Sequence, residues 1–441
     1  MKHALATLLF TFLSASSALA AGPFTMKDAV ELGLRENHAI RAAKAALGAA
    51  REEVGMARGQ LLPKLTFEER YMRTDNPTFV FSSKLGQERF TAADFAIDSL
   101  NSPEAINDFQ TSLSIEQPIY VRKAWVGLYM ARQEYSASID ELSAGREKTA
   151  FEIVTAYLNA STAEGFMAAA EAGAADAREH LRIAEARHTG GLGLYSDVLR
   201  AKTGLLEAEQ RLVTARKDLE LSRRALGMLL GLDDEATTSS SAFDIQLRKI
   251  SHYLSSAVDR SDLKSMKKRT ENARSTVSLA NSSYFPMVGV GGTYFMNDHE
   301  RPFGSEGESW QVSAFLRWNI FDGARSHEAA KARLKSIEAA ERLEGLRQSV
   351  SFSVRQAYLE VEEAKKNREL AEAALKNAEE GERLVRLRYE NSLSPLVDLL
   401  DAEASLSGAR ASLVMRKNAY SRSLAALSYA GGTILKDLGL E

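Results

Sequence analysis

Residues 194–212 read LYSDVLRAKTGLLEAEQRL, and residues 395–413 read PLVDLLDAEASLSGARASL. The two stretches lie 201 residues apart and share the spacing of their first aspartate, their leucines and their alanines. At this offset the chain matches itself without a gap from about Ile119 to Gly231, and an earlier block matches at an offset of 223, where Pro63 meets Pro286. Two such blocks indicate a tandem duplication, with a unit much larger than the roughly 20 to 50 residues of a solenoid repeat.

The duplication predicts three parts in a chain of 441 residues. Residues 1–20 have a polar start, an apolar centre and a small-residue end, so we expect a signal peptide that is cut after Ala20. Residues 21–235 form the expected first structural repeat, and residues 236–441 form the second, which ends in a short tail. The first copy carries 22 extra residues between about Asp75 and Phe109, where proline, serine, aspartate and asparagine predict a loop.

Proline placement and apolar periodicity predict long helices. No proline lies between Val121 and His188, and small residues recur there every seven positions from Thr149 to Ala184. The same period continues through the leucines after residue 198, and again from Leu399 to Leu427. A sustained seven-residue period predicts left-handed supercoiled helices. A helix over residues 121–188 would be about 100 Å long at 1.5 Å per residue.

Two short segments are predicted to turn the chain back between such helices. The first is rich in glycine, which accepts the positive φ angles of tight turns. The second contains serine and proline. Each copy is therefore expected to hold a long antiparallel helical hairpin, whose turns consist of Gly190, Gly191, Leu192, Gly193 and Leu194 in the first copy and Asn391, Ser392, Leu393, Ser394 and Pro395 in the second.

Before each hairpin the apolar period changes from seven to two. Residues 65–73 and 110–119 alternate in the first copy, and the stretches beginning at Met287 and Trp310 alternate in the second, the last one as far as Ile320. About ten alternating residues bounded by turn signals are typical of an outer-membrane β-strand, although a strand of a soluble sandwich has a similar pattern.

Four strands per chain cannot close a barrel, and open edges in lipid leave backbone groups unsatisfied. Two chains would supply eight strands, which leave an interior filled by side chains, whereas three chains supply twelve. No apolar stretch after Ala20 is long enough for a transmembrane helix. We therefore predict a mainly helical chain with membrane β-structure, in which three copies share a 12-stranded barrel and a ring of helical hairpins.

Several other kinds of chemistry are excluded. The chain has no cysteine, and its net charge of −3 gives no support for a nucleic-acid partner. His327-Glu328-Ala329-Ala330-Lys331 lacks the final histidine of a zinc-protease motif. The other histidines are scattered, so we expect no metal site, no cofactor and no enzymatic activity.

The ordered combination of strand pairs, duplicated hairpins and the motifs DVL and DLLD after the turns resembles the TolC-like outer-membrane efflux protein family, also called outer membrane factors. The resemblance covers the whole mature chain. It implies a homotrimer in outer-membrane lipid, with a helical barrel in the periplasm that meets a periplasmic adaptor (a membrane fusion protein) and an inner-membrane pump. The implied function is the passive exit duct of a tripartite efflux or type I secretion system.

The resemblance also implies roles for individual residues. Asp398 and Asp401 match the pair of acidic residues that lines the narrowest ring of the family's periplasmic entrance. Tyr389 and Asp197 match a tyrosine and an aspartate that bond between neighbouring hairpins and hold that entrance shut, and the two turns match the tips that contact the adaptor. The family archetype has an arginine at the position of Ser394, which leaves the strength of the closed state open.

Two other functions remain open from the residues alone. An exported coiled-coil scaffold would explain the long helices, and a periplasmic adaptor also carries a helical hairpin. An adaptor would have one hairpin and no barrel strands, and a scaffold would not need four amphipathic strands.

Overall fold

A computed structural model describes residues 23–191, 193–239, 243–391 and 393–440. The expected signal peptide lies outside this range. Among the described residues, no helix combines the length and the apolar character that a membrane crossing requires.

The chain forms two compact units, and each draws on both expected repeats. The first unit contains the described part of residues 1–43 together with residues 144–260 and 348–441. The second contains residues 44–143 and 261–347. The long helices pass from one unit into the other, so a repeat in the sequence is not a unit in space.

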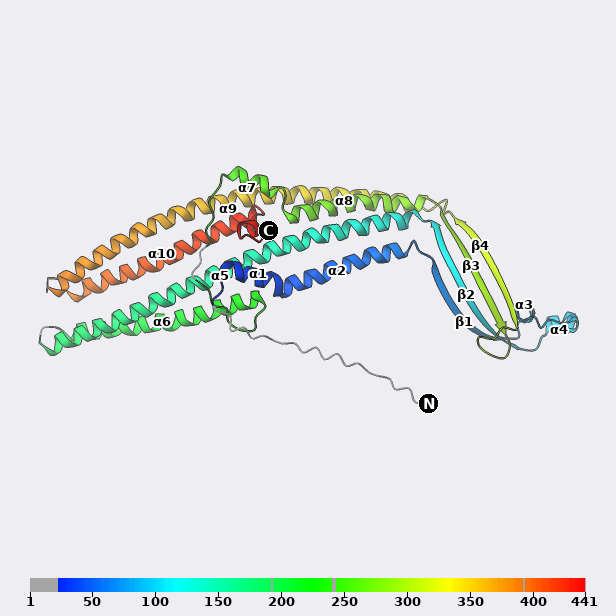
Figure 1. The fold of residues 1–441 in the computed structure, drawn as a ribbon, viewed down its shortest axis with the longest axis horizontal. Helices are drawn as coiled ribbons and strands as arrows, with labels where there is room; N and C mark the ends of the chain where they lie inside the picture. Colours follow the sequence, from blue (N-terminus) through cyan, green and yellow to red (C-terminus); the bar gives the residue numbers. More distant parts are fainter. Residues whose placement is uncertain (1–22, 192, 240–242, 392, 441) are drawn as a thin grey trace. The chain divides into compact units, whose positions relative to one another are not determined.

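The second unit holds an antiparallel sheet of four strands in the order β1–β2–β3–β4, visible in Figure 1. The strands are β1 (Lys64–Thr74), β2 (Ile106–Tyr120), β3 (Met287–Asp298) and β4 (Gly307–Arg317). Helix α2 (His38–Gly59) comes before β1, and α8 (Ser261–Asn281) and the short η2 (Ser282–Tyr284) come before β3. The four alternating stretches of the sequence are thus confirmed as strands, and β1 and β4 have free edges within the chain.

The prediction for the last strand was displaced by three residues. It placed the strand at residues 310–320, but β4 begins at Gly307 and ends at Arg317. Arg317 pairs with Met287, the first residue of β3, so the partner strand offers no backbone beyond this point. The indole of Trp318 instead donates a hydrogen bond to the carbonyl of Tyr284 at 3.1 Å.

The connection between β1 and β2 was predicted as a loop, and this was wrong. It contains α3 (Pro77–Gly86), the 3₁₀ turn η1 (Ala92–Phe95) and α4 (Ile97–Asn101). Asn76 caps α3 by accepting from the N–H of Thr78, and Pro77 occupies the first turn, where a missing N–H has no consequence. A helix can therefore begin at a residue that elsewhere signals a loop.

The two predicted hairpins are confirmed, and their turns lie in the first unit (Figure 1). Helices α5 (Arg122–Thr189) and α6 (Tyr195–Leu230) form one, and α9 (Arg325–Glu390) and α10 (Leu396–Ala430) form the other. Helices α1 (Met26–Glu36), α7 (Ile250–Ala257) and α11 (Ile434–Asp437) complete the unit. The largest of its fully buried side chains include Tyr157, Ile153, Leu226, Leu230, Leu424 and Leu427.

Candidate functional site

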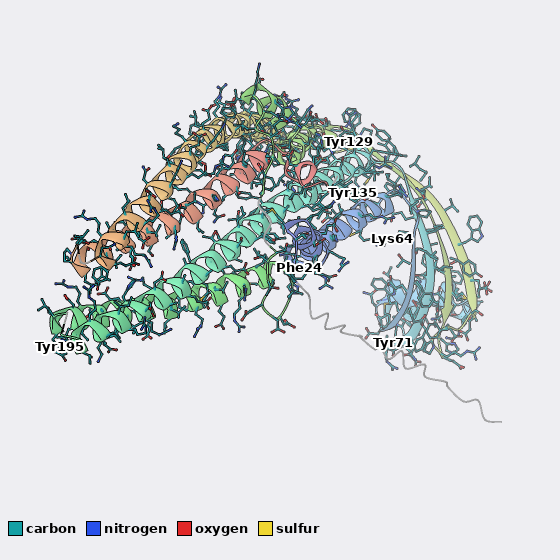
Figure 2. All side chains as sticks on the ribbon, turned by 60° about the vertical axis from the view of Figure 1, so that its left-hand side comes forward. Phe24, Lys64, Tyr71, Tyr129, Tyr135 and Tyr195 are labelled. Atoms are coloured by element: carbon teal, nitrogen blue, oxygen red, sulfur yellow. The ribbon has the colours of Figure 1, made fainter. Side chains whose placement is uncertain are left out.

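The turn between α5 and α6 is built from glycine. Gly191 has φ 73°, a conformation that L side chains rarely adopt. The N–H groups of Gly190 and Gly191 donate to the carbonyls of Ala186 and His188 at 3.0 and 2.9 Å, so they close the end of α5. The adjoining Tyr195 is labelled in Figure 2 at the turn end of this hairpin. Leu192, an expected tip residue, lies outside the described residues.

The turn between α9 and α10 uses different residues for the same reversal. The N–H of Leu393 donates to the carbonyl of Arg388 at 2.8 Å, and Pro395 precedes α10 in an extended conformation. The side chain of Leu393 is 69% exposed. Leu194 is nearly as exposed in the first turn, so each tip presents one leucine to the surroundings. Ser392 lies outside the described residues.

An apolar cluster joins the two hairpins just behind their turns. Its buried members come from all four long helices, and we call this set the hairpin cluster. Because it combines α5 and α6 with α9 and α10, the hairpins cannot separate here without exposing apolar surface. The members are Ala184, Val198, Ala201, Tyr389, Leu396 and Leu399.

Tyr389 lies in the hairpin cluster, and its bond to Asp197, which the resemblance implies, stays a prediction. In the described part of the chain, no hydrogen bond joins its hydroxyl to Asp197. The guanidinium of Arg187 on α5 instead lies 4.8 Å from the centre of the Tyr389 ring, close enough for a cation–π contact. Asp197 is half-buried in the first turn of α6, where its N–H donates to the carbonyl of Leu194. The structure thus places Tyr389 between the hairpins through its ring.

Asp398 and Asp401 are exposed and lie one turn apart on α10. Leu396 and Leu399, which alternate with them, are buried in the hairpin cluster. This division places the two carboxylates on the side of α10 that faces away from the cluster. Neither aspartate forms an ion pair within the described residues. Asp401 lines a groove of about 690 Å³ that also involves α5 and α6.

A group of charged side chains links the hairpins beside this groove, and we call it the ion cluster. Nε2 of His180 on α5 lies 2.6 Å from Oε2 of Glu403 on α10. Arg386 on α9 is 2.6 Å from Glu382 and 3.4 Å from Glu403. Burial alone would lower the pKa of Arg386, but the hydrogen bond to Glu382 and the nearby carboxylates of Glu403 and Asp176 raise the pKa above its usual value.

Sequence reasoning missed the ion cluster and Arg187, although a signal was present. Arg187 follows His180 by seven residues, and Tyr389 follows Glu382 by the same interval. On each helix the two residues therefore share one heptad row, which on α9 also contains the apolar Val354 and Val361. A polar residue that interrupts such a period indicates a position where a partner across the seam is needed.

The two faces of the sheet in the second unit differ sharply. Directly opposed residues of antiparallel strands point to the same face, which puts Phe67, Leu113, Tyr294 and Trp310 in one row and Leu65, Ile115 and Val312 in the next. The side chains of Trp310 and Val312 are 74% and 75% exposed. Within the described residues, this face thus presents large apolar side chains that are exposed.

The opposite face is polar. Arg70 donates to Gln110 at 2.8 Å, and Ser114 and Thr293 lie 3.2 Å apart across β2 and β3. Figure 2 labels Lys64 and Tyr71 toward the two ends of β1. One apolar face and one polar face, over strands of about ten residues, suit a barrel wall between lipid and water.

One group of possible metal ligands occurs among the described residues, at the connection between β3 and β4. It consists of Asp298, His299 and Glu306. The carboxylate of Asp298 accepts from the N–H groups of Glu300 and Arg301, and Nδ1 of His299 lies 2.6 Å from Glu306. These contacts explain the group as a closed turn.

The family model described as outer membrane efflux protein matches residues 29–232 and 254–433. The chain is 26% identical over 349 residues to Protein CyaE of Bordetella pertussis, covering 77% of this chain and 69% of that protein. The fold is similar to the CmeC outer membrane channel of Campylobacter jejuni, with a TM-score of 0.79 and 19% identity over 93% of this chain and 86% of that one. It is also similar to the open state of the MtrE outer membrane channel of Neisseria gonorrhoeae, with a TM-score of 0.76 and 20% identity over 93% and 89% of the two chains.

Proposed function

This chain belongs to the outer membrane efflux protein family, and from that premise we propose that it is the passive exit duct of a tripartite efflux or type I secretion assembly. The observation that carries the proposal is the sheet, because its uncovered apolar face suits lipid and its polar face suits a water-filled bore. A coiled-coil scaffold or an adaptor has no use for such a face. Fractionation should leave the protein with the outer membrane until detergent is added, and recovery in the soluble fraction would contradict the proposal.

We propose that the duct is a homotrimer. The edges of β1 and β4 are free, and an unpaired edge in lipid costs several kcal/mol for each unsatisfied backbone group. Pairing β4 of one copy with β1 of the next removes these edges, and three copies supply twelve strands. Mass measurement in mild detergent should give three chains per particle, whereas a single chain that still spans lipid would exclude this assembly.

The two turns are proposed to contact a periplasmic adaptor that connects the duct to an inner-membrane pump. Both tips expose a leucine at the end of a hairpin, which gives a partner apolar contacts on short, defined loops. Photo-crosslinkers at Leu194 and Leu393 should capture an adaptor in cells. Phe79 on α3 is an exposed control position in the second unit, and capture only there would reverse the proposed orientation.

We propose that Asp398 and Asp401 line the narrowest part of the bore. Three copies would bring six carboxylates together, and such a ring favours cations over anions. Their exposure on α10, opposite the buried Leu396 and Leu399, supports this role. Planar-bilayer recordings should show a preference for cations and block by a trivalent cation from the side of the tips.

Tyr389 and Asp197 are proposed to belong to the device that keeps this entrance closed. Tyr389 acts through its ring, which is held between the hairpins by the hairpin cluster and by Arg187. Asp197 lies at the start of α6, next to the buried Val198 of the same cluster. The open state described for the MtrE channel, which has a similar fold, supports a duct with more than one state.

A further inference from the structure

The ion cluster lies one helical turn behind the hairpin cluster. His180 comes four residues before Ala184, and Glu403 comes four residues after Leu399, both of which belong to the hairpin cluster. The residue His180 is 7% exposed. Its contact with Glu403 crosses from α5 to α10, so it connects the first hairpin directly to the second.

The contact depends on charge more than on hydrogen-bond direction. Nε2 of His180 lies 2.6 Å from the carboxylate oxygen of Glu403, yet the contact does not have the geometry of a hydrogen bond. A neutral imidazole in this position would gain little from Glu403. A protonated imidazole would gain the attraction of a nearby carboxylate in a poorly hydrated site.

We propose that His180 is a pH-sensitive link between the two hairpins, which holds them together while its imidazole is protonated and weakens when the imidazole is neutral. This inference rests on the proposed gate, because the link matters to transport only where separation of the hairpins opens the duct. Under this proposal the entrance responds to periplasmic acidity through His180, which is distinct from Asp398, Asp401 and Tyr389.

Several charged side chains lie around His180. Glu403 is close to Arg386, whose charge is also shared with Glu382 and Asp176, so the carboxylates on this side outnumber the arginine. The groove beside His180 adds charged residues of both signs from α6 and α10. Taken by element, the charged groups of the groove and of the ion cluster are Asp176 on α5, Arg200, Glu207 and Arg211 on α6, Glu382 and Arg386 on α9, and Asp401 and Glu403 on α10.

The direction of the effect follows from the charges. Histidine changes its charge between about pH 5 and 8, whereas glutamate is ionised throughout that interval. The attraction is therefore complete on the acid side and is lost as the pH rises. The hairpins should be held together near pH 5 and should separate more readily near pH 8.

Separation of the hairpins can be measured directly, because the chain has no cysteine of its own. Spin labels at exposed Thr189 and Glu390 would report the distance between the hairpins in the full-length assembly. In the parent, the separated population should rise by about tenfold across this pH range, which corresponds to about 1.4 kcal/mol. His180→Gln should remove the pH dependence, and His180→Lys, which stays charged, should keep the hairpins together at both ends of the range.

His327→Gln is the matched control, since His327 is exposed on α9 in the second unit and should respond as the parent does. The link is disproved if His180→Gln retains the parent's pH dependence, or if His180→Gln and His180→Lys respond alike. Single-channel conductance, recorded in parallel, separates this inference from the proposed function. If the distance between the labels depends on residue 180 but the protein conducts no ions, the result supports the link and rejects the duct.

Discussion

The two halves of the chain share a backbone plan but differ in their charges. At the offset of 201 residues, Val198 aligns with Leu399, and both are buried in the hairpin cluster. Asp197 aligns with Asp398, but Arg200 aligns with Asp401 and Lys202 with Glu403. The apolar seam is therefore common to both hairpins, whereas the second hairpin alone has acids at the latter two positions.

This difference shows how one duplicated fold can serve two roles in one wall. Apolar positions determine that both hairpins form and pack together. Charged positions determine what each hairpin presents to the other hairpin and to its surroundings. The first hairpin supplies His180 and Arg187, and the second supplies the acid Glu403 and the ring of Tyr389 that they contact.

The largest effect is expected from removing the shared apolar seam. Leu399→Ala leaves a cavity in the hairpin cluster and should lower the local free energy of opening by about 2–5 kcal/mol. Hydrogen exchange of the amides in residues 385–405 measures this. Val198→Ala at the aligned position removes fewer atoms and should have a smaller effect.

Val397→Ala provides the surface control for this experiment, because Val397 is 37% exposed next to the cluster. This substitution should change the local free energy of opening by no more than about 0.5 kcal/mol. Equal effects of Leu399→Ala and Val397→Ala would show that the cluster does not hold the hairpins together.

The next effect tests whether the second hairpin alone lines the narrow point. Asp398→Ala/Asp401→Ala should abolish the cation preference and weaken trivalent-cation block by about tenfold, or about 1.4 kcal/mol. Arg200→Ala, at the position aligned with Asp401, should leave both properties close to those of the parent. Bilayer recordings on the two variants show whether one hairpin or both hairpins of a chain line the narrow point. A large change in cation preference or block in Arg200→Ala would indicate that both do.

A smaller effect distinguishes the two contacts available to Tyr389. A cation–π contact is worth about 0.5–1 kcal/mol, so Arg187→Gln should raise single-channel conductance or the open fraction modestly. Tyr389→Phe keeps the ring and should change neither. The reverse pattern, with Tyr389→Phe active and Arg187→Gln silent, would show that the hydroxyl bonds to Asp197 in the assembled duct.

The smallest effect concerns the connection between β1 and β2, which contains α3, η1 and α4 and has no counterpart in the second copy. The hydrogen bond from Lys84 to Asp94, at 2.7 Å, and the bonds from Thr91 lower the pKa of Asp94 to about 2. A lowered pKa means that the stabilisation is present above the unfolded value of about 3.9 and is lost as the pH falls toward 2.

In Lys84→Met the loss of stabilisation should begin at a higher pH than in the parent. Near neutral pH the segment of residues 76–104 should behave as it does in the parent. Pepsin cleavage within residues 76–104, followed between about pH 4 and 2, measures the shift. Since both side chains are still partly exposed, only a slight change in cleavage rate is expected. An identical pH profile in the variant would mean that this ion pair does not order the segment.

The fold was predictable where a period was long. Seven-residue spacing gave both hairpins, and two-residue spacing gave all four strands, because each period records which face is buried. The end of β4 was missed because it depends on where its partner β3 begins, which no local pattern records. The helices of the insertion were missed because Asn76 and Pro77 suit the start of a helix as well as a turn.

The site was predictable in part for a related reason. Helical spacing places Asp398 and Asp401 on the same side of α10, and the structure exposes both. The partner of Tyr389 and the pairing of His180 with Glu403 depend on the rotation of one supercoiled helix against another. Such rotations are set by packing across the whole seam, so contacts between hairpins are the part that the sequence alone leaves undetermined.

The free edges of β1 and β4 also bear on how the protein reaches its membrane. A lone chain entering lipid would bring two unsatisfied edges with it, so insertion of single copies is strongly disfavoured. Copies must therefore associate before or during entry, and until then the apolar face of the sheet travels through water. We therefore expect biogenesis to use a carrier that shields this face, and depletion of such a carrier should leave aggregated or degraded chains while preformed ducts persist.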